Sequence, residues 1–502
     1  MPATMDAQTI EALEPQAVWR LFAGMSEIPR PSKKEERIRD HIRKVAENMG
    51  FTVRQDAQGN LAIDVPGTRG FENVPITVMQ GHLDMVCEAN AGTEHDFDRD
   101  PIRLIIDKDP HDGEQIVRAD GTTLGADNGI GVVMALAAAA DPNVVHGPLE
   151  ILCTLDEEAG MSGAKALTAE FIKGRRMLNL DAEEDDKIYI GCAGGCDTTL
   201  TWTFDPAPPP AGSLAVRVTV SGLKGGHSGC DIHLDRGNAI KLLARTLAVA
   251  DVEGACIIEL GGGRLRNALP REASAVLAIP ADGKAALDKA ANQVQGEGRG
   301  DHGDEGCVIS VEETTLAGDA VGLSAADSLR LLRALIALPH GVLGVVADIP
   351  GLVRTSNNVS SVRLETCAAD RSLQVILGCL SRSSSPVQID VLLRQIAAIG
   401  NATGANVELG NAYPGWAPDL ASDSLATCRS VYEKLFGEPP EVTAIHAGLE
   451  CGIIGERVPG MDMVSFGPRI EGAHSPDERV YVRSVQKSWK YLTAVLEALA
   501  RD

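Results

Sequence analysis

The chain has 502 residues, of which 44% are hydrophobic and 23% charged, and its formal net charge is -24 at pH 7. A chain of this length exceeds one ordinary hydrophobic core, so we expect two or three domains. The negative charge argues against nucleic acid or an anionic membrane as a partner, and no apolar run approaches the roughly 18 residues of a membrane helix.

The start of the chain and its cysteines predict a cytoplasmic protein. MPATMDAQTIEALEPQ lacks the basic and apolar regions of a secretory signal. The 11 cysteines have no repeated spacing, which is typical of reduced, buried thiols. Cys192 and Cys196 could form a zinc or redox pair, but packing of small core residues is the interpretation we favour.

The first predicted element is a helix over residues 32–50. Ser32 and Glu35 have the spacing of a capping box, apolar residues recur every three or four positions, and Gly50 is a stop signal. Residues 51–65 then predict two strands around a Gln-Gly-Asn turn.

Buried strands and a buried helix follow in alternation. Residues 74–80, 149–155 and 177–181 predict strands, and the small and aliphatic residues of 128–140 predict a helix between them. This alternation predicts an α/β sheet with helices on both faces.

The pattern changes after Asp197. The segment PAPPPAG resembles a linker, and a fresh set of strands begins at Leu214. Residues 292–306 are polar and rich in glycine, which predicts a mobile loop. The region 214–399 could hold two similar α/β halves.

From about Gly400 the α/β character returns, with a strand at MDMVSFG and a terminal helix over 485–500. An inserted domain is the simplest account of this order. We therefore expect a catalytic domain formed by residues 1–197 and 400–502, interrupted by a second domain over 198–399.

Acidic and histidine side chains follow several of the predicted strands or stand in a Gly-rich turn before a helix. They are His82, Asp84, Asp127, Asp156, Glu157, Glu158, Asp181 and His474. Each has an ordinary alternative, such as a loop histidine or, for Asp127, a helix N-cap. Ligands of open α/β sheets bind beyond the carboxyl ends of the strands, so these residues together predict one shared polar cluster.

Such a cluster predicts bound cations. Buried carboxylates repel one another, and their desolvation is costly unless a cation neutralises them. Two imidazoles with three or more carboxylates favour zinc, with manganese or cobalt as chemical substitutes. The donors suit two metal ions about 3.5–4 Å apart that share a carboxylate, with one further carboxylate free as general base. Spacing alone does not distinguish Glu157 from Glu158 as that base.

The chain closely resembles the aminoacyl-histidine dipeptidases, also called Xaa-His dipeptidase, peptidase D or bacterial carnosinase. They belong to the aminoacylase/carboxypeptidase clan of zinc exopeptidases. The motifs that carry the resemblance run in order from the first helix to the last: GHLDMVCEAN, TLGADNGIG, TLDEEAGMSGA, NLDAEE, IGCAGG, GLKGGHSGCDIHLDRGNA, LRNALPREA, AYPGWAPD, IHAGLECG and GPRIEGAHSPDE. The resemblance implies a catalytic domain with a central mixed sheet flanked by helices, interrupted by an inserted α+β lid domain.

The resemblance also implies a role for each polar residue. Five residues would hold two zinc ions: His82 and Asp181 the first, Glu158 and His474 the second, with Asp127 bridging both. Glu157 would be the general base and proton shuttle, and Asp84 would fix the tautomer of the His82 imidazole. A cis peptide is expected between Asp127 and Asn128.

In the lid, His227 of GGHSG would stabilise the oxyanion or hold the substrate carboxylate, although a surface loop histidine is the ordinary alternative. Asn267 and Arg382 are candidates for binding the substrate carboxylate, and Arg354 competes with Arg382. Glu450 of HAGLECG would line the site.

The implied activity is hydrolysis of Xaa-His dipeptides, including β-alanyl-histidine. A broad-specificity dipeptidase or an aminoacylase is the alternative within the clan, and an inactive binding or scaffold protein is the alternative of another class. A dipeptide is thus the expected partner. Dimers are common in the family, but a long lid could complete the site within one chain, so a homodimer stays open.

Overall fold

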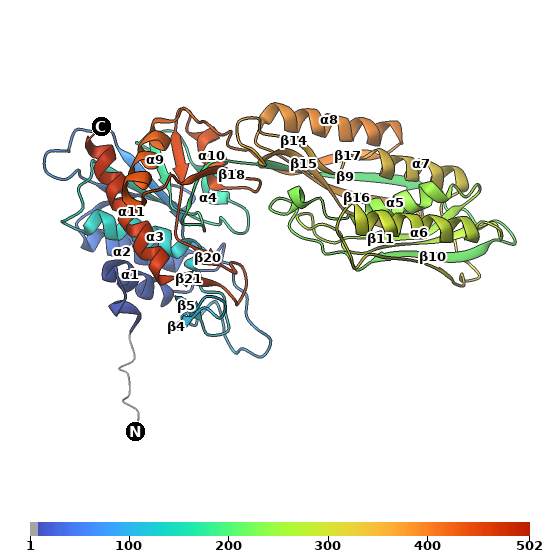
Figure 1. The fold of residues 1–502 in the computed structure, drawn as a ribbon, viewed down its shortest axis with the longest axis horizontal. Helices are drawn as coiled ribbons and strands as arrows, with labels where there is room; N and C mark the ends of the chain where they lie inside the picture. The colour runs from blue at the N-terminus through green and yellow to red at the C-terminus, as the bar shows by residue number, and fades with distance from the viewer. Residues whose placement is uncertain (1–8, 502) are drawn as a thin grey trace, which may run out of the picture. The chain divides into compact units, whose positions relative to one another are not determined.

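The computed structural model describes residues 9–501, which form two compact units (Figure 1). The first unit comprises the chain up to Gly191, Pro418–Ala444 and the chain from Leu449 onward. The second comprises Cys192–Ala417 with Ile445–Gly448. Within residues 9–501, no helix combines the length and the apolar character needed to cross a bilayer.

The first unit contains a mixed eight-stranded sheet in the order β1-β2-β6-β3-β7-β19-β8-β18. In that order the strands are Thr52–Gln55, Leu61–Val65, Leu149–Thr154, Thr77–His82, Arg176–Asn179, Asp462–Ser465, Lys187–Cys192 and Glu441–Ile445. The central strands β6, β3, β7 and β19 are mutually parallel, so their carboxyl ends meet at one edge.

The helices of the first unit include α3, which packs against β3 and α1 and is buried almost all round. They are η1 (Ile10–Ala12), α1 (Gln16–Ser26), α2 (Glu36–Asn48), α3 (Ala126–Ala140), α4 (Ser162–Ala166), α9 (Asp423–Phe436), α10 (Glu450–Arg457) and α11 (Val482–Arg501). The predicted α/β class is confirmed, as are the strand pair over 51–65 and the helices over 128–140 and 485–500.

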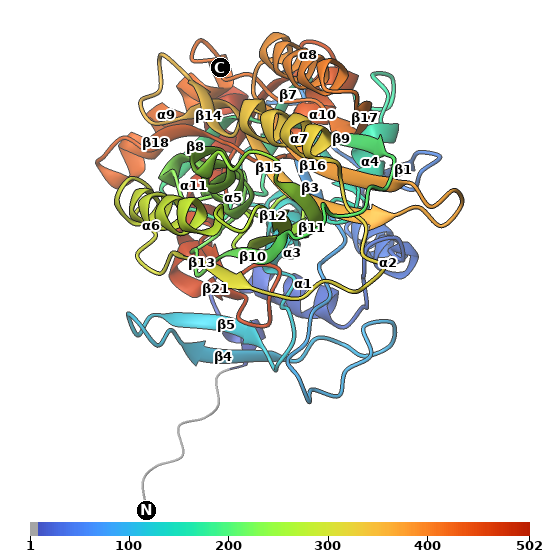
Figure 2. The ribbon, with the colours of Figure 1, turned by 90° about the vertical axis from the view of Figure 1, so that its right-hand side faces the viewer.

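A small antiparallel sheet completes the first unit, in the order β20-β21-β5-β4. Figure 2 labels its strands β21, β5 and β4. Its strands are Ile470–Glu471, Arg479–Tyr481, Gln115–Ala119 and Leu104–Lys108. The turn between β20 and β21 carries His474, so this sheet gives the histidine loop a fixed base.

The capping box predicted for the first helix is wrong. Helix α2 begins at Glu36, and the Ser32 hydroxyl instead donates to Asp84 Oδ2 at 2.8 Å. Glu35 Oε1 accepts from the backbone N–H groups of Lys33 and Asp156, each at 2.9 Å. Ser32 therefore binds a distant segment, and Glu35 binds both a distant segment and the neighbouring Lys33, so the two residues do not form a reciprocal cap. Gly50, with φ at +88°, ends the helix region as predicted.

The second unit is built on an antiparallel sheet in the order β13-β10-β12-β11-β15-β16-β9-β17, with β14 attached to β15. The strands are Val308–Glu313, Leu214–Ser221, Ala273–Ile279, Cys256–Gly262, Val353–Thr366, Leu373–Ser383, Gly194–Phe204, Asn406–Tyr413 and, for β14, Gly341–Val345. Its helices are η2 (Ile232–Leu234), α5 (Ala239–Ala250), α6 (Lys284–Gly300), α7 (Ala325–Ala337) and α8 (Pro386–Ala402). All four α-helices share one aliphatic core against the sheet, and therefore lie on the same face of it.

This sheet contains two halves of identical topology. The first runs β10-α5-β11-β12-α6-β13 and the second β9-α7-β15-β16-α8-β17, and each has its first strand between its third and fourth. The halves meet where β11 pairs with β15. The prediction of two similar halves is thus confirmed, but the range 214–399 is wrong, because the first half is inserted between β9 and α7 of the second.

The pairing of β9 with β16 and β17 places the boundaries between the units at other residues than the sequence predicted. The sequence predicted boundaries at 197 and 399, whereas the units divide at Gly191 and Pro418. Strand β9 pairs along its whole length with β16, and β17 pairs with β9, so both belong to the second sheet. Only these long-range pairings assign residues 192–197 and 400–417 to the second unit.

The predicted mobile loop over 292–306 is also wrong in its first part. Helix α6 continues to Gly300, and its apolar positions Leu287, Ala291, Val294 and Gly298 face the core. Gly298 lies against Cys307, where the absence of a side chain lets the returning chain pack closely. The apolar spacing therefore outweighs the low helix propensity of the glycines.

We predict opposite effects for two glycine substitutions in α6. Gly296→Ala should raise the free energy of unfolding by roughly 0.5–1 kcal/mol, because the position is helical and a Cβ there meets nothing within 4 Å. Gly298→Ala should lower it, because the Cβ would lie 2.9 Å from Cys307 Sγ. Denaturant unfolding followed by circular dichroism measures both. Equal effects would indicate that this segment is not the packed helix described.

Candidate metal centre

The parallel strands of the first unit bring the predicted ligands to one edge. β3 ends at His82, which pairs in register with Thr154 at the end of β6. Gln80 of β3 pairs with Asn179 at the end of β7, so Asp181 comes level with His82. Glu157 and Glu158 come three and four residues after the end of β6, and Asp127 comes from the start of α3.

Asp127 lies between two histidine–carboxylate pairs. His82 Nε2 is 3.0 Å from Asp127 Oδ1 and 3.3 Å from Asp181 Oδ1. His474 Nε2 is 3.3 Å from Asp127 Oδ2 and 3.0 Å from Glu158 Oε2. Each oxygen of the Asp127 carboxylate therefore faces a different pair.

These donors fit metal ions. One ligand atom each from His82, Asp127 and Glu158 lie within 4.8 Å of one another. The distances of 3.0–3.3 Å are close to the roughly 3.3 Å that separates two ligands at a tetrahedral zinc with bonds of about 2.0–2.1 Å. Glu158 Oε1 and Asp181 Oδ1 are buried and accept no hydrogen bond. Buried, unsatisfied carboxylate oxygens of this kind call for a cation.

The raised pKa values of two residues in the cluster show that it also favours bound protons. Burial raises the pKa of Asp181 to about 6, and the neighbouring carboxylates of Asp127 and Glu158 add to the effect. Hydrogen bonds to Asp127 and Glu158 raise the pKa of His474 to about 11. A metal ion bound here would take the place of these protons.

Asp84 organises both the first histidine and the acidic turn. Its Oδ1 is 3.4 Å from His82 Nδ1, and its two oxygens accept the backbone N–H groups of Glu157 and Glu158 at 3.1 and 3.2 Å. Burial alone would raise the pKa of Asp84, but these bonds, with those from His82 and Ser32, lower it to about 2. The ionised carboxylate therefore leaves His82 Nε2 free to face Asp127 and Asp181.

Glu157 and Glu158 follow a strained residue and face different partners. Asp156 has φ at +56°, a left-handed conformation that turns the chain sharply after β6. Glu158 faces His474, whereas Glu157 lies beside the acids of the cluster. Burial, with the charges of Asp181 and Glu158, raises the pKa of Glu157 well above its usual range.

The peptide between Asp127 and Asn128 is cis, as the resemblance implied. Asn128 Nδ2 donates to the Leu180 carbonyl at 2.7 Å, which ties the start of α3 to the residue before Asp181. Gly81 permits this approach, because a Cβ there would collide with the Asn128 side chain.

The candidate substrate residues of the second unit form two groups. His227 Nδ1 accepts from the backbone N–H groups of Gly229 and Cys230 at 3.3 and 3.1 Å, which leaves Nε2 as the donor nitrogen of a neutral ring. The Asn267 loop lies beside it, since the Asn267 carbonyl accepts from Ser228 N at 2.7 Å.

Arg382 forms the other group. It is 5% exposed, donates to the Tyr413 hydroxyl at 2.8 Å, and has no ion pair with a carboxylate among residues 9–501. Its Nε is buried without a partner. A buried guanidinium in this state favours binding of an anion. Arg354, the competing candidate, also has a buried Nε without a partner.

Comparison with known proteins agrees with this geometry. Residues 78–498 match the sequence profile of Peptidase family M20/M25/M40. The chain belongs to this family. It is 42% identical over 98% of its length to the cytosol non-specific dipeptidase of Escherichia coli K12, of which 99% is covered. The aminoacylhistidine dipeptidase of Vibrio alginolyticus superimposes with a TM-score of 0.88 at 42% identity, and 98% of each chain is covered.

A more distant solved structure shares the fold. Aminopeptidase PepT from Bacillus cereus has a TM-score of 0.62 at 17% identity, with 97% of this chain and 99% of that one covered. At this identity the likeness concerns the fold alone. The resemblance drawn from the motifs is therefore confirmed by both the sequence profile and the structures.

Glu450 of this M20/M25/M40 peptidase lies among the buried acids near the centre. It was expected to line the substrate site, but 0% of its surface is exposed. Gln80 Nε2 and Thr154 Oγ1 donate to its Oε2 at 2.6 and 2.5 Å, so Glu450, at the start of α10, is hydrogen-bonded to side chains of β3 and β6. Burial raises the pKa of Glu450 to about 8.

Sequence reasoning missed several polar residues around the centre. Arg30, Glu183 and Glu478 are the main ones. Glu183 stood in the motif NLDAEE and Glu478 in GPRIEGAHSPDE, but neither side chain was singled out. Burial, with the charges of Asp127 and Asp181, raises the pKa of Glu183 to about 8. Their roles depend on contacts that the local sequence does not contain.

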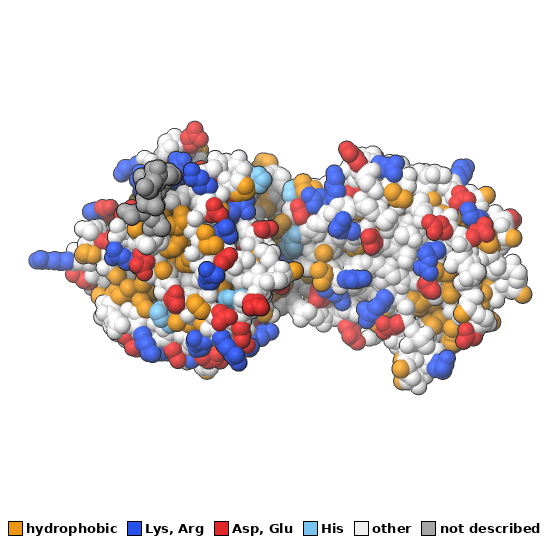
Figure 3. Space-filling view, turned by 90° about the horizontal axis from the view of Figure 1, so that it is seen from below, with side chains coloured by type: hydrophobic (Ala, Val, Ile, Leu, Met, Phe, Trp, Pro, Cys, Tyr) orange, Lys and Arg blue, Asp and Glu red, His pale blue; other side chains and the backbone are white. Residues whose placement is uncertain are grey.

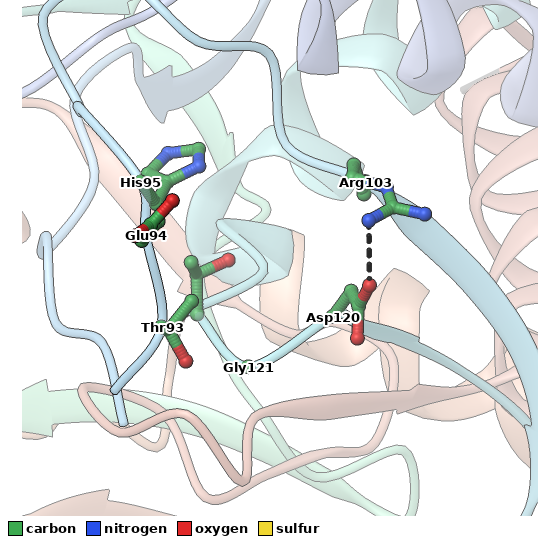
Figure 4. Close-up of a pocket in the computed structure, with 7 residues that line it drawn as sticks. Thr93, Glu94, His95, Arg103, Asp120 and Gly121 are labelled. Carbon is green, nitrogen blue, oxygen red and sulfur yellow. Dashed lines mark ion pairs between the residues drawn. The ribbon is translucent and has the colours of Figure 1, made fainter. Parts of the chain in front are cut away.

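A separate cavity of about 240 Å³ lies elsewhere in the first unit (Figure 4). It is lined by Thr93, Glu94, His95, Arg103, Asp120, Gly121 and Thr122, and Arg103 pairs with Asp120 at 2.9 Å. It contains none of the candidate ligands, so it is distinct from the metal centre.

Surface charge is mixed on the face drawn in Figure 3. Lys and Arg side chains alternate there with Asp and Glu, and the described residues form no continuous basic band on it.

Asp84→Asn should weaken metal binding by roughly 10–100-fold, because an amide cannot accept from both acidic-turn N–H groups and His82 together. Metal content after dialysis against graded chelator measures the loss. Asp109→Asn is the matched control, since Asp109 is also buried and accepts two backbone N–H groups away from the centre. Equal metal loss in both variants would contradict the assigned role.

Proposed function

We propose that this protein hydrolyses dipeptides, among them Xaa-His dipeptides such as β-alanyl-histidine, at a centre of two zinc ions. Manganese or cobalt would substitute for zinc. The observation that carries the proposal is the Asp127 carboxylate, whose two oxygens face separate histidine–carboxylate pairs. Relatives that match nearly the whole chain at 42% identity are named a cytosol non-specific dipeptidase and an aminoacylhistidine dipeptidase.

Five side chains would hold the metal ions. His82 and Asp181 would bind one, Glu158 and His474 the other, and Asp127 both. Such a pair supplies polarisation of the scissile carbonyl and a water that is acidic enough to deprotonate near neutral pH. The donor set contains nitrogen and oxygen atoms without sulfur, which suits zinc, manganese and cobalt alike.

Glu157 would move the proton. Its carboxylate is not paired with a histidine, unlike that of Glu158, so it is available to accept a proton from the attacking water. The same carboxyl group then donates that proton to the amine of the departing residue. The raised pKa of Glu157, caused first by its burial, favours holding the proton between these two steps.

The second unit would bind the rest of the substrate. His227 Nε2 would donate to the oxyanion, because its Nδ1 is already engaged as an acceptor. Arg382 would bind the terminal carboxylate, with Tyr413 holding one arm of the guanidinium, and Asn267 would add a polar contact. The lid predicted over residues 198–399 would then correspond to the whole second unit, Cys192–Ala417 with Ile445–Gly448.

The alternatives within the family differ in substrate specificity. The E. coli relative is named non-specific, which favours a dipeptidase that also accepts residues other than histidine. An aminoacylase would differ in taking a blocked amino terminus. An inactive binding protein would have lost Glu157 or a ligand, and all six stand in the sequence. We place the enzyme in the cytoplasm, and a homodimer stays a prediction for native mass measurement.

Two adjacent substitutions separate the base from a ligand. Glu157→Gln should keep both metal ions and lower kcat by about 10²–10⁴-fold or more, because the proton acceptor is lost. Glu158→Gln should lower the metal content toward one ion per chain. Metal analysis and release of free histidine from β-alanyl-histidine measure both. If Glu157→Gln lost metal and Glu158→Gln kept it, the two roles would be exchanged.

The substrate class is tested with three compounds on metal-free protein and after addition of zinc, manganese or cobalt. β-Alanyl-histidine and a dipeptide without histidine should both be cleaved once metal is restored, and N-acetyl-histidine should be cleaved far more slowly. The free amino group distinguishes the first two compounds from the third. Preferred cleavage of N-acetyl-histidine would favour the aminoacylase, and no cleavage of any compound would contradict the proposal.

A further inference from the structure

Glu478 is a buried carboxylate that holds the backbone of the Asp127 turn. It is 2% exposed. Its Oε2 accepts from Leu124 N at 2.6 Å and Gly125 N at 2.9 Å, and its Oε1 accepts from Ala126 N at 2.7 Å and Asp127 N at 3.3 Å. One side chain therefore binds four consecutive N–H groups, the first of them 354 positions away in the sequence.

These N–H groups have no partners within α3. The first N–H groups of a helix point out of its end, and a carboxylate placed there is favoured by both hydrogen bonding and the helix dipole. Glu478 satisfies them at the very turn that presents Asp127. The direction of the Asp127 side chain is set by this backbone, so Glu478 controls where that carboxylate lies.

Glu478 also ends the loop that carries His474. Glu478 N donates to the Ser475 carbonyl at 3.0 Å, and Ser475 N donates to the Gly472 carbonyl at 3.1 Å, which closes the loop on itself. His474 itself has φ at +64°, a conformation that non-glycine residues adopt only when their surroundings hold them. The same residue therefore anchors Asp127 and His474, whose side chains lie 3.3 Å apart.

Arg30, whose charge is opposite to that of Glu478, holds the same turn from its carbonyl side. Its buried guanidinium donates to the carbonyls of Leu83 and Asp84, each at 3.0 Å, and to that of Gly125. Gly125 thus gives its N–H to Glu478 and its carbonyl to Arg30. This pair of buried charges links the turn of Asp127 to the strand end of His82 as well as to the loop of His474.

We infer that Glu478 is a positioning residue that sets the distance between Asp127 and His474, and through it the affinity for the metal ion assigned to Glu158 and His474. The inference rests on the proposed two-metal function. Glu478 is not itself a ligand in this arrangement, because both of its oxygens are occupied by backbone N–H groups. It acts on the metal through the two residues that it holds.

The test is Glu478→Gln in the full chain. The amide nitrogen would face two N–H donors where an oxygen accepted them, so the Asp127 turn must shift. We expect the affinity for the second metal ion to fall by roughly 10–100-fold. Metal content at buffered free zinc should then drop from two ions toward one, the visible spectrum of the cobalt form should change, and kcat should fall more than KM rises.

Glu150→Gln is the matched control. Glu150 is 1% exposed, pairs with Arg54, and accepts the backbone N–H groups of Lys173 and Gly174 near the other end of β6. It should lower the thermal midpoint by a similar amount without changing the metal content or the cobalt spectrum. Equal metal loss in both variants would show general destabilisation and overturn the inference.

Native metal affinity in Glu478→Gln would overturn it as well. If that variant does not fold, Glu478→Asp replaces it, since the shorter carboxylate keeps the charge but cannot reach both pairs of N–H groups. Loss of one ion from folded Glu478→Asp supports the inference, and two ions held at native affinity refute it. A native chain without stoichiometric metal would refute the proposed function itself. Failure of the proposed function can thus be distinguished from failure of the inference about Glu478.

Discussion

Mutual repulsion among buried carboxylates is the constraint on which this structure depends. Burial raises the pKa of Glu157, Asp181 and Glu450, and the charges of neighbouring carboxylates raise it further. Such a group of carboxylates is stable only if positive charge neutralises it. The two imidazoles can neutralise part of the negative charge, and bound metal ions would neutralise the rest. The parallel strands make the repulsion unavoidable, because they deliver the acids to one edge.

The protein meets this constraint with a second set of carboxylates that bind backbone instead of metal. Asp84 holds the N–H groups of Glu157 and Glu158, Glu35 holds that of Asp156, and Glu478 holds the turn of Asp127. Each fixes a segment that presents a proposed metal ligand or the proposed base. Ligands held in this way lose little conformational entropy when metal binds, so the site is organised in advance.

The second unit distributes its candidate residues over both halves of its sheet. His227 follows β10 and Asn267 lies in the β11–β12 connection, so both belong to the first half, whereas Arg382 stands on β16 of the second. Two copies of one topology have therefore taken different polar side chains. Arg382 reaches the Tyr413 hydroxyl across Gly195, since the three residues share one row of paired strands and Gly195 leaves room for the tyrosine ring.

The sequence alone was enough to predict the residues proposed for the metal centre, because each stands shortly after a strand or in a short motif that is visible in the local sequence. Tertiary structure decided everything that depends on distant pairing. Ser32 and Glu35 looked like a helix cap but bind Asp84 and Asp156, and the first half of the second sheet proved to be inserted between β9 and α7 of the other half. Residues 292–300 became helix because their apolar face packs on a core, and Glu478 gained its role from N–H groups 354 positions away. Local patterns record propensity and strand ends, whereas hydrogen-bond partners across the fold exist only once the chain has closed on itself.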